Sequence, residues 1–63
     1  MISFKPLWVT LAERGMKKSD LYTVTSSATV SRMGKNEYVS LEVIDKICTF
    51  LNCDVSAVIK REE

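Results

Sequence analysis

The sequence predicts a single all-α domain, residues 1–63, built from five short helices. With 63 residues, the chain is long enough for one small hydrophobic core and too short to divide it between two domains. Hydrophobic residues make up 46% of the chain, charged residues 27%, and there are only two glycines and one proline, a composition typical of a folded globular domain. Apolar residues recur at helical intervals, and no segment clearly predicts a strand, although residues 2–4 and 38–40 could lie extended.

The first helix is predicted from about Phe4 to Arg14. Its apolar residues are Phe4, Leu7, Trp8, Leu11 and Ala12. This spacing places them on one buried stripe. Ser3 is suited to cap the helix, Pro6 is tolerated in the first turn, and Gly15 can take the left-handed conformation that ends a helix.

A short second helix is predicted within residues 16–24. Met16, Leu21 and Val24 can face inward, but β-branched residues lower the helix propensity toward the end of this segment. Residues 25–27 are Thr-Ser-Ser, which favour helix N-caps, so the chain is expected to turn and start a new helix near Ser26.

The third helix is predicted from about Ser27 to Met33, with Val30 and Met33 as its buried residues. Gly34 and Asn36 are expected to close it and to open a loop that runs through residue 38. The side chains on the opposite face of this helix are those of Ala28, Ser31, Arg32 and, if the helix continued, Lys35. A ridge of small and basic residues can enter the DNA major groove closely, but the same pattern also fits an ordinary solvated helix.

The fourth helix is predicted after a Ser40 cap. Its apolar residues are Leu41, Ile44, Ile47, Cys48 and Leu51. They form one buried stripe, and Asn52 follows at the expected left-handed position. Asp54 can cap a last short helix over 55–60, with Val55, Val58 and Ile59 facing inward.

Charge is distributed unevenly along the chain, although the net charge is only +1. Residues 14–36 carry the basic residues Arg14, Lys17, Lys18, Arg32 and Lys35 against Asp20 alone. The segment after residue 36 carries more acidic than basic side chains. This asymmetry is weak evidence for an anionic partner.

Composition argues against several classes of protein. Histidine is absent, so the usual base for a Ser or Cys nucleophile is missing and a zinc site would need an unusual ligand set. Cys48 and Cys53 cannot build a disulfide scaffold, and we interpret them as small core hydrophobes rather than ligands or redox sensors. No segment predicts a signal peptide or a membrane span. We therefore expect a cytoplasmic protein with reduced thiols, no enzymatic activity and no metal or other cofactor.

These residues resemble the Cro and phage-repressor helix-turn-helix family, particularly its small stand-alone bacterial members. The resemblance covers nearly the whole chain. It rests on Gly15-Met16, Asp20-Leu21, the segment SSATVSRM at 26–33, Gly34-Lys35-Asn36 and the segment SLEVIDKIC at 40–48. The turn between Leu21 and Ser26 is shorter than is common in the family and lacks its usual glycine. The resemblance implies a lambda-repressor-like domain whose third helix enters the major groove of double-stranded DNA, and hence a sequence-specific transcriptional regulator.

The resemblance also implies a set of DNA-binding residues. Lys18 falls where the family contacts a phosphate, residues 26–29 begin the recognition helix, Arg32 follows one turn later, and residues 35–36 form the loop after it. The implied set is Lys18, Ser26, Ser27, Ala28, Thr29, Ser31, Arg32, Lys35 and Asn36. Basic side chains, hydroxyls and amides suit phosphates, Arg can also pair with guanine, and Ala can contact a thymine methyl.

A homodimer is expected, because one helix with short side chains reads few base pairs, but no sequence feature identifies the dimer surface. The alternative function is a protein-interaction adaptor, antitoxin-like or polymerase-binding, with weak or no DNA binding. A small Lys-dependent enzyme is a more distant alternative.

Overall fold

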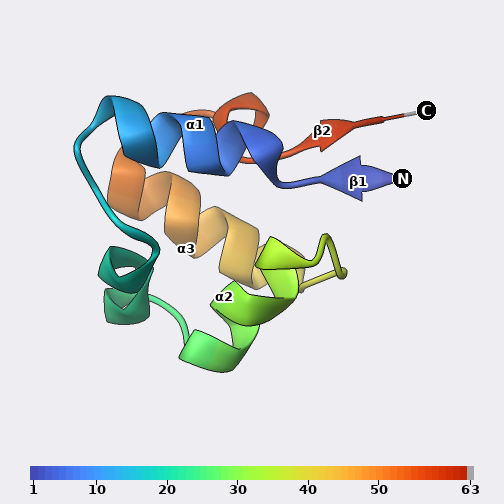
Figure 1. The fold of residues 1–63 in the computed structure, drawn as a ribbon, viewed down its shortest axis with the longest axis horizontal. Coiled ribbons are helices and arrows are strands. Elements are labelled where there is room, and N and C mark those ends of the chain that lie inside the picture. Colours follow the sequence, from blue (N-terminus) through green and yellow to red (C-terminus); the bar gives the residue numbers. More distant parts are fainter. Residues whose placement is uncertain (63) are drawn as a thin grey trace.

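The computed structural model describes residues 1–62, and within them the chain forms three α-helices, two 3-10 helices and one pair of very short strands (Figure 1). The elements are β1 (Ile2–Ser3), α1 (Lys5–Glu13), η1 (Lys18–Thr23), α2 (Ser27–Gly34), α3 (Leu41–Leu51), η2 (Val55–Ala57) and β2 (Lys60–Arg61). Helix α3 crosses the middle of the molecule, with α1 on one side and η1 and α2 on the other (Figure 1). The predicted all-α class is confirmed, but two of the five predicted helices are 3-10 turns.

The second helical segment lies within the predicted range 16–24 and is a 3-10 helix. The amide of Lys17 donates to Oδ2 of Asp20 at 2.8 Å, and the amide of Asp20 donates to the carbonyl of Lys17 at 3.0 Å. This reciprocal pair fixes the start of η1 at Lys18. Met16 lies before it, with its amide donating to the carbonyl of Leu11 at the end of α1.

The last predicted helix, 55–60, is wrong in its second half. Only η2 is helical, and the Thr10 hydroxyl of α1 donates to the carbonyl of Ala57 at 2.8 Å. Lys60 instead lies in β2, which pairs antiparallel with β1 through Ser3 and Lys60. The extended conformation considered for residues 2–4 is thus confirmed at Ile2–Ser3, whereas 38–40 form no strand. After η2 the chain leads into β2 instead of continuing the helix.

The start of α1 differs from the predicted Ser3 cap. Phe4 is the N-cap residue, and the Ser3 hydroxyl accepts from the Lys5 amide at 3.1 Å. The Phe4 amide donates to Oδ1 of Asn36 at 3.0 Å, so a distant loop supplies a further tie at this end. Gly15 has a φ of +66° after the end of α1, as its predicted role requires.

The hydrophobic core draws on α1, η1, α2 and α3, and on Val58 just after η2. Its buried residues are Phe4, Leu7, Leu11, Leu21, Val30, Met33, Ile44, Ile47, Leu51 and Val58. Three residues predicted to face inward are instead exposed: Ala12, Leu41 and Val55. Each lies near an end of its helical segment, where no neighbouring element covers it. Helical periodicity identifies a face but not how far along that face the core extends.

Candidate nucleic-acid interface

The turn between η1 and α2 is short because two successive amides donate to the same carbonyl. The amides of Val24 and Thr25 both donate to the carbonyl of Leu21 at 3.0 Å. The tight 3-10 geometry of η1 brings these groups together without a glycine in the turn. This explains why the connection from Leu21 to Ser26 is shorter than the resemblance leads one to expect.

The first turn of α2 is held by two hydroxyl side chains. Ser26 is the N-cap residue, and its Oγ accepts from the amide of Thr29 at 3.2 Å. Oγ of Ser26 also lies 3.0 Å from Oγ1 of Thr29 in a side-chain hydrogen bond. Both residues belong to the predicted DNA-binding set, and their hydrogen bonds to each other stabilise the start of the helix.

The buried side of α2 sets its exposed side. Val30 and Met33 are buried in the core, and η1 contributes the fully buried Leu21 beside them. The opposite side chains, Ser27, Ala28, Ser31 and Arg32, are exposed. Lys35 directly follows the helix and is exposed too. Among residues 1–62, none of these five side chains forms an intramolecular hydrogen bond or ion pair, so the predicted exposed face is free to contact a ligand.

Lys18 has neighbours that the sequence did not reveal. Its Nζ lies 4.4 Å from the ring centroid of Trp8, a cation–π contact between η1 and α1. The same atom lies 3.8 Å from the position that a β-carbon on Gly34 would occupy, at the C-terminal end of α2. The Lys18 side chain therefore lies between η1, α1 and the C-terminal end of α2. A cation at this place is favourable, because the C-terminal end of a helix dipole is negative.

Asn36 is also a structural residue. It is half-buried with a φ of 57°, and its Oδ1 accepts from the Phe4 amide. The side-chain amide nitrogen is the part of Asn36 that remains available to a ligand. Its role in closing the helix was expected, but its hydrogen-bond partner, the Phe4 amide, lies 32 residues away and leaves no local pattern.

The basic segment 14–36 contributes fewer cations to this face than its sequence suggests. Nη1 of Arg14 donates to the carbonyl of Leu51, so Arg14 belongs to the α1–α3 contact. The remaining cations are Lys17, Lys18, Arg32 and Lys35, all exposed. The one acidic residue in the segment, Asp20, accepts from a backbone amide. The face around α2 is therefore positively charged and suited to an anion.

The part of the chain that the structure describes contains no group of three or more His, Cys, Asp or Glu residues placed to hold a metal ion. Its helices also include none that is long and apolar enough to cross a bilayer.

Comparison with known proteins supports the geometric description. Residues 6–63 match the family model of the Cro/C1-type helix-turn-helix DNA-binding domain. The fold is similar to the crystal structure of the transcriptional regulator VanUg, form II, with a TM-score of 0.88 and 43% sequence identity. That similarity covers 94% of this chain and 81% of the VanUg chain. No curated protein sequence matches the chain.

Proposed function

The chain belongs to the Cro/C1-type family of helix-turn-helix DNA-binding domains and is a DNA-binding transcriptional regulator, and we propose that it reads double-stranded DNA by inserting α2 into the major groove. The exposed face of α2 is the observation that carries this assignment. Its side chains are small, with one arginine, and a double hydroxyl cap holds the helix start rigidly. Small side chains let the helix axis approach the base edges, and Arg32 has the reach to pair with guanine.

Phosphate contacts flank this helix in the proposal. Lys35 follows the end of α2, and Lys17 and Lys18 lie at the start of η1. The amides of Ser27 and Ala28 precede the first intrahelical hydrogen bond of α2, so they can donate to a phosphate oxygen. Lys18 contributes less than Lys35, because its ammonium group already lies against Trp8.

Salt-dependent binding tests the proposal. Affinity for duplex DNA should fall linearly with the logarithm of salt concentration, because bound phosphates release counterions. Replacing Lys35 with Ala should reduce the slope by about one unit, and adding Lys18→Ala should bring the reduction to at most about two. The matched control is Lys46→Ala on α3, whose ammonium pairs with Glu42 at 3.3 Å. An unchanged slope in both variants that carry Lys35→Ala would show that the loop after α2 does not contact phosphates. Absence of duplex binding would favour the alternative function, a protein-interaction adaptor.

We also propose that two copies pair on an inverted repeat. One helix of eight residues contacts few base pairs, and a second copy doubles the contacts. Tyr38 and Leu41 lie just after the helix-turn-helix and are 74% and 80% exposed. Such high exposure of two large apolar side chains is consistent with a surface that a second copy covers. Since the proposed ligand is duplex DNA, we infer that the protein acts in the cytoplasm.

Sedimentation separates the dimer from a monomer. Leu41→Glu should shift the association equilibrium toward monomer, because pairing would bury an unpaired charge. Val9→Glu is the matched control, since Val9 is also an exposed apolar residue, 53% exposed, but lies on α1. A monomeric wild-type chain at concentrations that saturate its DNA site would contradict the dimer.

A further inference from the structure

The C-terminal end of α3 is a Schellman motif that holds two cysteines side by side. The amide of Cys53 donates to the carbonyl of Cys48 at 3.0 Å, and the amide of Asn52 donates to the carbonyl of Thr49 at 3.3 Å. Asn52 has the left-handed conformation of this motif, with φ 51° and ψ 53°. In a Schellman motif, the residue two positions beyond the helix contacts the residue in its last turn. Those two positions are here Cys53 and Cys48.

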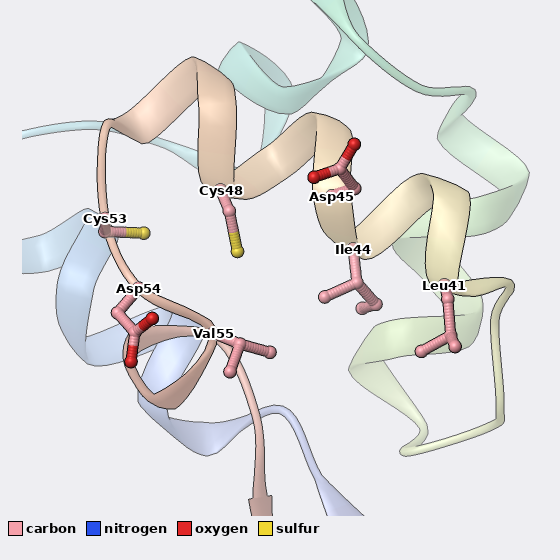
Figure 2. A pocket seen from close by; sticks show the side chains of 7 residues that line it. All are labelled: Leu41, Ile44, Asp45, Cys48, Cys53, Asp54 and Val55. Carbon is pink, nitrogen blue, oxygen red and sulfur yellow. The ribbon is translucent and has the colours of Figure 1, made fainter.

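Both cysteine side chains line one open groove, and the thiol of Cys53 points toward Cys48 (Figure 2). Both cysteines are free and half-buried. The carboxylates of Asp45 and Asp54 line the same groove. Both cysteines pack against the edge of the hydrophobic core, as small core residues would, but they are half-buried and also line the groove.

We propose that Cys48 and Cys53 form a modification site that reacts with small-molecule disulfides, cationic ones in preference, and closes into an intramolecular disulfide. The Cys53 thiolate attacks one sulfur of the small disulfide, forming a mixed disulfide and releasing the first small thiol. The Cys48 thiolate then attacks Sγ of Cys53, forming the Cys48–Cys53 bond and releasing the second small thiol. The protein dithiol is oxidised, the small disulfide is reduced to two thiols, and the two protons from the cysteines end on those thiols.

The groove determines the order of attack and the preferred reagent. Burial and the neighbouring Cys53 raise the pKa of the Cys48 thiol, so Cys48 is the poorer first nucleophile at neutral pH. It becomes effective in the second step, where the Schellman motif holds it beside the mixed disulfide. Asp45 and Asp54 repel anions, so a cationic disulfide such as cystamine should react faster than anionic glutathione disulfide at low ionic strength.

Mass spectrometry of the reduced, folded protein treated with cystamine tests the proposal. The expected product is a monomer lighter by two hydrogens, with peptide mapping that links Cys48 to Cys53. Ring closure should be at least about tenfold faster in the folded protein than in guanidinium, because the fold raises the effective concentration of the second thiol. A lasting mixed disulfide on the folded wild-type chain, cross-linked dimers alone, or closure no faster than in the unfolded chain would overturn the proposal.

Two sets of variants sharpen the test. Cys48→Ser should stop at the mixed disulfide on Cys53, whereas Cys53→Ser should react slowly with cystamine, and equal rates would contradict the assigned order. Asn52→Gly keeps the left-handed residue that the motif requires and should close as the wild type does. Asn52→Val strains that conformation and should slow closure severalfold. Equal closure rates in the two Asn52 variants would show that the motif does not position the thiols.

Discussion

Helices α2 and α3 begin in the same way and differ in what they bury. Each follows a serine whose Oγ accepts from the amide three residues later, at 3.2 Å for Ser26 and 3.3 Å for Ser40. Helix α3 buries Ile44, Ile47 and Leu51, whereas α2 buries Val30 and Met33. The same type of serine N-cap therefore begins two helices that differ in how much of their surface is buried. The longer helix anchors the core, and the shorter one exposes most of its surface.

The exposed faces of the two helices differ in charge as well. On α3, Lys46 pairs with Glu42 one turn earlier, so its positive charge is balanced within the helix. On α2, Arg32 is exposed and forms no ion pair with any residue from 1 to 62. The charge of Arg32 on α2 is therefore available to a polyanion such as DNA, whereas the charge of Lys46 on α3 is neutralised by Glu42. We therefore expect substitutions in α3 to act mainly on stability and substitutions on the exposed face of α2 to act mainly on DNA binding.

The largest expected effect is on stability and lies in α3. Ile47 is fully buried, so Ile47→Ala should lower the free energy of unfolding by about 2 to 5 kcal/mol. Ser31→Ala, on the exposed face of α2, should change it by less than about 0.5 kcal/mol. Urea denaturation followed by circular dichroism measures both values. A cost for Ile47→Ala as small as that for Ser31→Ala would contradict the division between the helices.

The next effect is on DNA discrimination and lies in α2. If Arg32 pairs with guanine, Arg32→Ala should remove about 1 to 3 kcal/mol of preference at one base position. If Arg32 holds a phosphate, the same variant should weaken binding to all sequences alike. Affinities for a duplex selected from a random pool and for each of its single-base variants decide between the two. Uniform loss would defeat base reading by Arg32 and leave Ser27, Ala28 and DNA shape to supply specificity.

The two serine caps allow a matched comparison. Ser26→Ala and Ser40→Ala should each cost about 1 kcal/mol of stability, because each leaves one amide of the first turn without its partner. Aspartate can replace serine as a cap, so Ser26→Asp and Ser40→Asp should both retain stability. Only Ser26→Asp should weaken DNA binding, since it places a negative charge at the start of α2. Equal affinities of the two Asp variants would show that this end of α2 does not face the DNA.

Local patterns were sufficient to predict much of the fold and the exposed face of α2. The spacing of Leu7 and Leu11 predicted α1, Ser40 and Asn52 marked the limits of α3, and Val30 and Met33 oriented α2. These predictions succeeded because each depends on residues within a few turns of one another. The exposed basic face of α2 follows from the same local geometry.

The features that sequence analysis missed depend on contacts between distant segments. The Asn36–Phe4 hydrogen bond, the position of Lys18 over Trp8 and the pairing of β1 with β2 all join segments that no periodicity connects. The Schellman contact of the two cysteines is the exception, because its residues are five apart. Asn52, already expected to be left-handed, was the local indication that Cys48 and Cys53 would meet.

The smallest expected effect concerns the end of α3, where Cys48 has no counterpart in α2. Because the folded protein raises the pKa of this thiol above its ordinary value of 9.0, the folded state holds its proton more tightly than the unfolded state. Cys48 therefore contributes stability that is fully present below pH 9.0 and is lost as the pH rises through the folded pKa. In a reducing buffer, the free energy of unfolding of the wild type should fall more steeply above that pH than that of Cys48→Ala, which lacks the titrating thiol. Parallel curves for the two proteins would mean that the end of α3 leaves the thiol as free to ionise as an unfolded chain does.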